Sequence, residues 1–454
     1  MTHSPGTATA WDALGGDPAL LSRITCRRRA GALPARLPVI ELARACVGVC
    51  ALAGAELASL RSGRPLGSVH VDDGAVAAAF TSERHLRVDG RAPVNFAPLS
   101  RFWRAQDGWV RTHANYPHHR SRLCEALGLG PDAAEREAAE LIAASPAHEV
   151  EEKAYAAGAL AVALRTPAQW AAHPQGVAVA ARPLLTRQRL NDAAARAKQD
   201  VTPPRVLDLT RVIAGPTATR TLALLGADVL RVDSPHLPED PCAHADTGFG
   251  KRSTRLDLSH NADRRTFEEL LADADVVVMG YRPRALDRFG LAPQALIERR
   301  PGLVVAALSA WGDYGPWAER RGFDSLVQVA TGIAATEGSP TKPGVLPAQA
   351  LDHGTGYLIA AGVLRALTDQ VREGGSHVLH HALAQTAHWL QYNVQPQTGT
   401  AQDAVDDAAW LTETDSALGR LQYALPPVSF TDGPTDWARP PGRWGADEPV
   451  WTSP

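Results

Sequence analysis

The chain of 454 residues is poor in cysteine, has no long apolar run and carries a formal net charge of only −3. Its five cysteines form no regular framework of pairs, which is typical of a reducing compartment. No stretch of about 18 apolar residues could cross a membrane, and the N-terminus lacks the basic start and apolar core of a secretory signal. We therefore expect a cytoplasmic protein that contacts neither membrane nor nucleic acid, since no global basic field would hold a polyanion.

What the sequence does contain is typical of a folded enzyme-sized chain, with 45% hydrophobic and 21% charged residues. Its length favours more than one domain. Changes in composition predict five parts: a flexible lead-in (1–33), a smaller α+β domain (34–187), a linker (188–204), a second domain (205–395) and an extended C-terminal tail (396–454). The tail is rich in Pro, Gly and Trp, and its tryptophans require burial against another surface.

The smaller domain is predicted from two patterns. The segment VIELARACVGVCALAGAELASL, which begins at Val39, is apolar or small on all sides, as in a buried helix. The segment SRFWRAQDGWVRTHANYPHHRSRLCEAL alternates aromatic residues on both sides of Asp107-Gly108, which predicts a strand, a tight turn, a strand and then a helix.

After the linker, apolar strands alternate with helices. VLDLTRVIAGPTATRTLALLGADVLRVD reads as strand, helix and strand, and FEELLADADVVVMG and LIERRPGLVVAALS repeat the order of helix and strand. Continuous Val and Leu strands indicate a parallel sheet that is covered on both faces. The predicted fold class is therefore α/β, with a Rossmann-like doubly wound parallel sheet, a smaller α+β domain and an extended tail.

Ligands of such sheets bind beyond the carboxyl ends of the strands, and three of the four loops expected there are basic. Their cations could hold phosphates through charge-assisted hydrogen bonds, or they could be scattered solvated side chains. Neither GxGxxG nor GxxxxGK[ST] follows the first strand, which disfavours a dinucleotide or ATP. The basic side chains are Lys251, Arg252, Arg282, Arg288, Arg320 and Arg321.

Asp352 stands at the start of a predicted long helix in QALDHGTGYLIAAGVLRAL. An Asp in such a place is most often an N-cap. The glycines that follow it would also let a large substrate approach the backbone, and the helix N-terminus would favour an ionised, nucleophilic carboxylate.

Five blocks between residue 205 and about residue 390 resemble, in order, the family III CoA-transferases, which include formyl-CoA and carnitine CoA-transferases and related racemases. The blocks are VLDLTRVIAGPTATRTLALLGADVLRVD, GKRSTRLDL, ADVVVMGYRPRALDRFGL, SAWGDYGPWAERRGFDSLVQVATG and QALDHGTGYLIAAGVLRAL. The resemblance implies transfer of CoA between an acyl-CoA and a carboxylic acid, with no permanently bound cofactor. It also implies a homodimer whose two chains interlock.

The resemblance further implies that Asp352 attacks the thioester and carries CoA as an aspartyl thioester. The CoA-contacting positions that it implies are Val212, Ile213, Ala214, Leu256, Asp257, Leu258, Tyr281, Arg282, Arg288 and Arg321. Asp324 is interpreted as structural. The alternatives are a CoA-binding protein without transferase activity and a CoA-ester racemase.

The sequence departs from the family pattern in several ways. The smaller domain precedes the catalytic half, as if the chain were permuted or descended from a fused, shortened repeat. Ser234 replaces a frequent basic residue, Gly280 a frequent Asn, and no Gly-rich flap is present. Phe323 stands where racemases of the family have their acid-base His, which disfavours racemisation. The His clusters at 113–119 and 377–388 lack the spacing of a ligand set, so no metal is expected.

Overall fold

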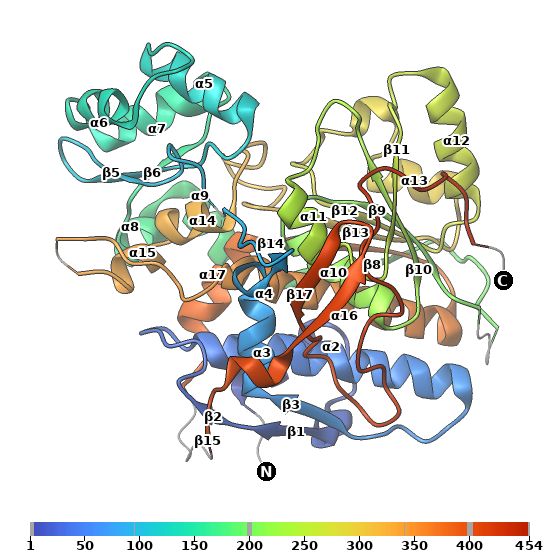
Figure 1. Cartoon of the computed structure of the whole chain (residues 1–454). Coiled ribbons are helices and arrows are strands. Elements are labelled where there is room, and N and C mark those ends of the chain that lie inside the picture. The colour runs from blue at the N-terminus through green and yellow to red at the C-terminus, as the bar shows by residue number, and fades with distance from the viewer. Residues whose placement is uncertain (1–3, 95, 198–201, 340, 397–402, 453–454) are drawn as a thin grey trace.

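The computed structural model describes residues 4–94, 96–197, 202–339, 341–396 and 403–452. A seven-stranded sheet of order β11-β10-β9-β12-β13-β14-β8 lies at its centre (Figure 1). Six of its strands are parallel and β8 pairs antiparallel with β14. The strand order reverses between β9 and β12, as in a Rossmann-like sheet, so the predicted α/β fold class is confirmed. The strands are β8 (Leu185–Leu190), β9 (Arg205–Leu209), β10 (Asp228–Asp233), β11 (Arg252–Arg255), β12 (Val276–Met279), β13 (Val304–Ser309) and β14 (Ser376–Ala382).

Alternate residues of the strands face two helical layers. Val276 and Val278 belong to the core formed with the helices α2, α10 and α16, whereas Val277 and Met279 pack with α12 and α13. Burial on both faces explains why these strands are continuously apolar. The covering helices are α2 (Val39–Ser62), α10 (Ala214–Leu224), α12 (Asn261–Ala272), α13 (Pro293–Arg299) and α16 (Ala350–Glu373).

The predicted buried helix, α2, packs along α16 (Figure 1). Glu56 on α2 accepts a hydrogen bond from Arg365 on α16 at 2.6 Å, and both side chains are buried. A Cβ added to Gly354 would lie 3.0 Å from the Leu42 side chain, so the two helices meet at close range. The N-terminal half of the chain is thus part of the core around the large sheet.

The expectation that the first 33 residues form a flexible lead-in is wrong. From Pro5 onward they fold as α1 (Pro5–Ala13), η1 (Pro18–Arg23), β1 (Ile24–Arg27) and β2 (Arg29–Ala30). Trp11 is 1% exposed, donates from Nε1 to the Asp17 carbonyl and lies under the Arg365 guanidinium. Burial of this large indole against a distant segment stabilises a region whose local composition is polar.

The smaller α+β unit is narrower than the predicted span 34–187. Its own hydrophobic core runs from Leu99 to Ala163, and it forms the lobe of α5, α6 and α7 in Figure 1. The predicted hairpin at Asp107-Gly108 is present. The elements are β5 (Phe102–Arg104), β6 (Trp109–Thr112), β7 (Ala161–Ala163), α5 (Pro117–Leu127), α6 (Glu135–Ala143) and α7 (Ala147–Ala156). The predicted linker 188–204 begins inside β8, which is part of the large sheet, and its residues 198–201 lie outside the described residues.

The remaining short elements connect these parts around the edge of the sheet. They are β3 (Val69–Asp72), α3 (Asp73–Phe80), α4 (Ser82–His85), β4 (Arg87–Val88), α8 (Pro167–Ala172), α9 (Pro174–Ala180), α11 (Pro241–Thr247), η2 (Asp287–Phe289), α14 (Asp324–Ala330), α15 (Ile333–Thr336) and α17 (Leu383–Tyr392).

The C-terminal tail is only partly extended. It contains β15 (Asp403–Ala404), η3 (Asp407–Trp410) and a hairpin of β16 (Leu411–Ser416) and β17 (Gly419–Ala424). Beyond the hairpin, the indole nitrogens of Trp437, Trp444 and Trp451 donate to Arg220, Asp233 and Leu270 of the second domain. The tail therefore packs along the β10–β11 side of the sheet, as its tryptophans require.

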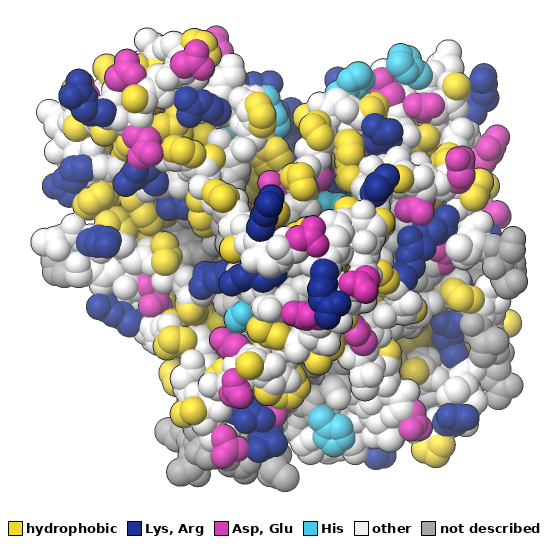
Figure 2. Space-filling model, viewed as in Figure 1, with side chains coloured by type: hydrophobic (Ala, Val, Ile, Leu, Met, Phe, Trp, Pro, Cys, Tyr) yellow, Lys and Arg dark blue, Asp and Glu magenta, His cyan; other side chains and the backbone are white. Residues whose placement is uncertain are grey.

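Acidic and basic side chains are interspersed over the face drawn in Figure 2, which is notched between the α5–α7 lobe and the lobe that carries α12. Among the helices of the described ranges, none is long and apolar enough to span a membrane. The described residues likewise contain no cluster of three His, Cys, Asp or Glu side chains that could hold a metal.

Candidate active site

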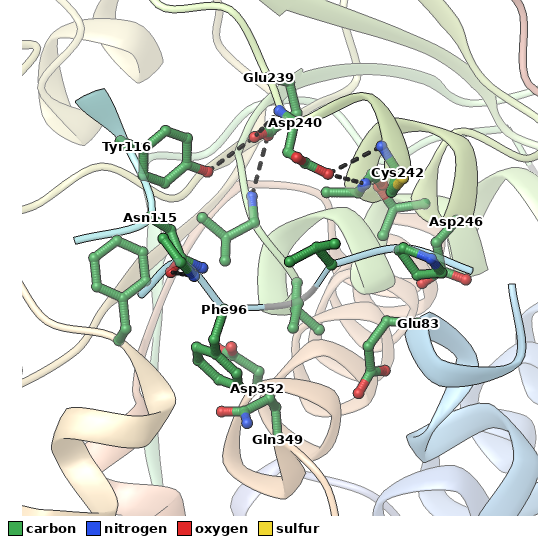
Figure 3. Close-up of a pocket in the computed structure, with 18 of the residues that line it drawn as sticks. Glu83, Phe96, Asn115, Tyr116, Glu239, Asp240, Cys242, Asp246, Gln349 and Asp352 are labelled. Carbon is green, nitrogen blue, oxygen red and sulfur yellow. Dashed lines mark hydrogen bonds between the residues drawn. The ribbon is translucent and has the colours of Figure 1, made fainter. Parts of the chain in front are cut away.

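A pocket of about 420 Å³ lies where the first turn of α16, the loop after β9 and the N-terminal segment 83–117 meet. Figure 3 shows Asp352, Gln349 and Glu83 on one side of it and Tyr116 and Glu239 on the other. Its lining mixes apolar side chains with several carboxylates, and it includes Glu83, Leu86, Phe96, His113, Asn115, Tyr116, Val212, Ile213, Glu239, Asp246, Phe323, Asp324, Ser325, Gln349 and Asp352.

Asp352 is the third residue of α16 and is 6% exposed. The N-cap position belongs to Gln349, so Asp352 is not the cap that its sequence context favoured. The capping role falls to Asp324 at the start of α14, whose Oδ2 accepts hydrogen bonds from the backbone N–H groups of Leu351 and Asp352, each at 2.9 Å. Asp324 thus satisfies two free donors of the first turn and fixes the backbone that carries Asp352.

Burial and neighbouring charge govern the protonation of the three carboxyls around this turn. Burial raises the pKa of Asp352 well above its usual value, and the charges of Asp324 and Glu83 raise it further. Burial also raises the pKa of Asp324, to about 6. Burial alone would raise the pKa of Glu83, but the hydrogen bond and charge of His353, together with smaller contributions from a backbone hydrogen bond and from Arg84, hold the pKa below the ordinary value. A carboxylate in such surroundings is strongly basic once it is ionised.

The loop after β9 forms the opposite wall of the pocket. This loop follows the strand at which the order of the sheet reverses. Val212 adopts a φ of 73°, which is unusual for a β-branched residue and stores strain in the loop. Its N–H donates to Glu239 Oε2 at 3.3 Å. Glu239 is also bound by Arg231 at 2.8 Å and by the Tyr116 hydroxyl at 2.9 Å (Figure 3). Glu239 therefore holds the strained loop in place.

A second pocket, between α7 and the loop before α14, is lined by Arg282, Arg320 and Arg321. Arg320 pairs with Glu152, but within the described ranges neither Arg282 nor Arg321 makes an ion pair with a carboxylate. Burial lowers the pKa of Arg321, and the nearby positive charges of Arg282 and Arg122 lower it further. Guanidinium groups held together in this way form an attractive site for an anion.

The other residues predicted to contact CoA lie in three places. Ala214 opens α10 beside the main pocket and is buried. Leu256, Asp257 and Leu258 follow β11, where Asp257 accepts hydrogen bonds from Ser259 and His236. Tyr281 packs against the core on the α12 side, and exposed Arg288 lies over the ring of Phe289. Thus Val212, Ile213 and Asp352 share one pocket, Arg282 and Arg321 share the other, and neither pocket lining includes the remaining six.

Three pocket residues escaped the sequence reasoning. Glu83 comes from the short helix α4 and Tyr116 from the start of α5, so both reach Asp352 only through tertiary folding. Glu239 lies in the segment after β10, where it is the glutamate of LPED, a stretch that resembles any surface loop. The one local feature is Tyr116-Pro117, which predicts a helix start but indicates no role in a site.

In comparisons with known proteins, one protein family matches part of the chain. Residues 204–412 match the model of CoA-transferase family III. The chain is 33% identical over 239 residues to an acetyl-coenzyme A transferase of Hypoxylon pulicicidum, covering 49% of this chain and 38% of that protein. It is 35% identical over 205 residues to a probable fatty acyl-CoA transferase of Mycobacterium tuberculosis, covering 42% of this chain and 52% of that protein.

Among solved structures, a hypothetical protein from Mycobacterium tuberculosis is 32% identical and superimposes with a TM-score of 0.40 over 45% of this chain and 58% of that one. The chain therefore spans about half or less of the length of the curated relatives above.

Proposed function

We propose that this chain, whose residues 204–412 belong to CoA-transferase family III, moves CoA from an acyl-CoA thioester to a free carboxylic acid, with Asp352 as the nucleophile. The observation that carries the proposal is the buried carboxyl of Asp352 in the first turn of α16, facing a pocket walled by the loop after β9. In Rossmann-like sheets this loop lies at the ligand-binding edge.

The reaction proceeds by covalent catalysis. The Asp352 carboxylate attacks the thioester carbonyl, the C–S bond breaks, and an acyl-aspartyl anhydride and CoA thiolate form. The thiolate attacks the Asp352 acyl carbon, which gives an aspartyl-CoA thioester and releases the donor acid as its carboxylate. The acceptor carboxylate then attacks this thioester, and the thiolate expelled takes the acceptor acyl group, which regenerates Asp352.

The local electrostatics support this role for Asp352. The carboxyl has no cationic partner among the described residues, and its raised pKa makes the ionised form a strong nucleophile. The hydrogen bonds from Leu351 and Asp352 to Asp324 keep the first turn of α16 rigid, so the nucleophile is oriented before substrate binds.

Arg282 and Arg321 are proposed to hold phosphates of CoA. Their pocket lies outside the one that contains Asp352, as expected for a long ligand whose thioester and nucleotide ends bind apart. A phosphate would also relieve the mutual repulsion of these guanidinium groups. The family resemblance further predicts a homodimer, which stays a prediction.

The racemase alternative gains little from the structure. Phe323 stacks on His113 at 3.7 Å between ring centroids, so an imidazole is present at the pocket. Burial, with the charge of Arg111, lowers the pKa of His113 to about 3. Such a ring is a weak base and is poorly suited to remove a proton from carbon.

The test separates a transferase from a protein that only binds CoA. Wild-type protein is incubated with acyl-CoA, treated with hydroxylamine and analysed by intact mass and peptide mapping. A hydroxamate at Asp352, absent from Asp352→Ala, is expected, together with loss of transfer by at least about 1000-fold. CoA binding without an adduct, or full turnover by Asp352→Ala, contradicts the proposal.

A further inference from the structure

Helices α2 and α16 resemble each other in length and in how they begin. Each has 24 residues, and each begins after a residue with nearly the same backbone angles: φ −76° and ψ 61° at Pro38, φ −73° and ψ 63° at Gln349. Each ends at a glycine with positive φ, Gly63 at 70° and Gly374 at 69°, although ψ differs, at 7° and −155°. The two starts (39 and 350) and the two closing glycines (63 and 374) are separated by the same 311 positions. The copies therefore align without a gap.

The similarity continues past the helices. α2 is followed by β3, which runs directly into α3, and α16 is followed by β14, which runs directly into α17. At the same spacing, Glu41 corresponds to Asp352 and Arg44 to Thr355. Arg44 joins α2 to α3 through Asp73 at 2.9 Å, and Thr355 joins α16 to α17 through Thr386 at 2.6 Å. We refer to residues 38–80 as the N-terminal copy.

The N-terminal copy has lost the surroundings of a nucleophile. Glu41 lies 3.9 Å from the guanidinium of Arg44, which also binds Asp73. Asp352, in contrast, faces two carboxylates. The copy instead packs on α16, with Leu42 close to Gly354 and Glu56 bonded to Arg365.

The end of the N-terminal copy leads into the active site. α3 ends at Phe80, and α4 places Glu83 in the wall of the Asp352 pocket (Figure 3). Phe80 stacks on Tyr357 of α16 at 5.8 Å, and Glu83 Oε2 lies 3.3 Å from Nε2 of buried His353. The position of Glu83 is therefore fixed by two contacts with the helix that carries the nucleophile.

On the basis of the function proposed above, we propose that the N-terminal copy acts as a built-in partner for the active copy. The helix α4 that follows it supplies Glu83 as a positioning residue, which anchors the first turn of α16 through His353 and sets a second negative charge beside Asp352.

The charged groups around Asp352 and Glu83 define the effect of Glu83. Asp352 is faced by Asp324 from α14 and by Glu83 from α4, whereas Glu83 is faced by His353 from α16 and by Arg84 of its own helix at 3.7 Å. Because His353 keeps Glu83 ionised, its charge persists at pH values where Asp352 titrates. Ionisation of Asp352 next to this charge is disfavoured, so it requires a higher pH.

The proposal is tested on full-length protein by titration of aspartate carboxyls labelled with ¹³C, with the Asp352 resonance assigned as the one lost in Asp352→Asn. In wild type the Asp352 midpoint should lie well above the ordinary value of about 4. In Glu83→Gln it should fall by about one pH unit, because a like charge is removed. Glu83→Asp should keep the wild-type midpoint, and the acid limb of the transfer rate should follow the same order.

Glu41→Gln is the matched control, since it makes the same change at the position of the N-terminal copy that corresponds to Asp352. Its Asp352 midpoint should equal that of wild type. If Glu83→Gln does not fold, Glu83→Ala serves instead: it removes the same negative charge, so the midpoint should fall likewise. An unchanged midpoint in folded Glu83→Gln or Glu83→Ala, or an equal fall in Glu41→Gln, overturns the proposal. The titration needs no turnover, so it can fail or succeed independently of the transferase assignment.

Discussion

Replacement of Gly356 by alanine tests whether α10 and α16 must touch for the site to form. Gly356 lies four residues after Asp352 on α16, and an added Cβ would stand 2.6 Å from the carbonyl oxygen of Ala214 and 2.9 Å from Cβ of Thr217. The first of these atoms belongs to backbone and cannot turn aside. Since Ala214 directly follows Val212 and Ile213, the alanine has to push the loop after β9 away from the nucleophile.

The magnitude follows from two opposing effects. Overpacking of a dense interface costs about 1 to 3 kcal/mol. Alanine in place of glycine inside a helix gains about 1 kcal/mol. Gly362 on the same helix offers a matched control, because its added Cβ would meet the side chains of Leu379 at 3.4 Å and His381 at 3.6 Å, which are ordinary contacts. Gly362→Ala should gain only the helix-propensity stabilisation, without the cost of overpacking. The free energies of unfolding of the two variants should therefore differ by about 2 kcal/mol.

The assay combines urea unfolding of both variants with measurement of kcat/KM for one acyl-CoA donor. Gly356→Ala should lower kcat/KM by about 10-fold to 100-fold, since a misplacement of about 1 Å has effects of that order. Gly362→Ala should leave kcat/KM close to wild type. Equal stability of the two variants would refute the steric reasoning, and unchanged kcat/KM in Gly356→Ala would show that the α10–α16 contact does not position the loop.

Two other outcomes can be checked directly. Arg321→Ala should weaken binding of CoA by about 10-fold or more, as expected for loss of a charge-assisted hydrogen bond, whereas exposed Arg136→Ala should not; isothermal titration with CoA measures both, and equal affinities would remove Arg321 from the phosphate site. Burial lowers the pKa of the His381 imidazole to about 3. The unfolded chain therefore takes up this proton at a higher pH than the folded chain does. The free energy of unfolding then falls as pH drops from about 6.5 toward 3, by about 1.4 kcal/mol per pH unit for this group. His381→Gln should therefore show a shallower fall in its urea midpoint between pH 6.5 and 4 than wild type, and an identical slope would contradict this cause.

The parallel sheet was accessible from sequence because both faces of each strand are buried, which leaves continuous apolar runs such as Val276–Met279. Asp352 stood out at the start of a long, regular helix, but that position favoured an N-cap, and only the family resemblance implied a nucleophile. The lead-in was misjudged although Ser4-Pro5 is a helix-start pair: Ser4 is the N-cap of α1 and Pro5 its first residue. This segment is stabilised by the burial of Trp11 under Arg365, a contact that no local sequence pattern predicts.

Glu83 and Glu239 mark the limit of sequence reasoning at the site. Each lies in a short polar stretch, and its significance comes from partners outside that stretch: His353 for Glu83, and Arg231 with Tyr116 for Glu239. A local window weighs propensity and periodicity, neither of which distinguishes a solvated glutamate from a buried one. Only the tertiary structure brings these carboxylates next to a nucleophile or a strained loop.

The N-terminal half is not an appendage to the catalytic half. Residues 204–412 match the family, yet β8 completes the sheet by pairing with β14, and α2 covers the buried face of α16. Without these residues, β14 would present an unpaired edge and α16 an apolar face to water, both of which favour aggregation. The pocket would also lose Glu83, Phe96 and Tyr116 from its wall. Changes in the N-terminal copy should therefore alter the protonation of Asp352 as well as the stability of the fold.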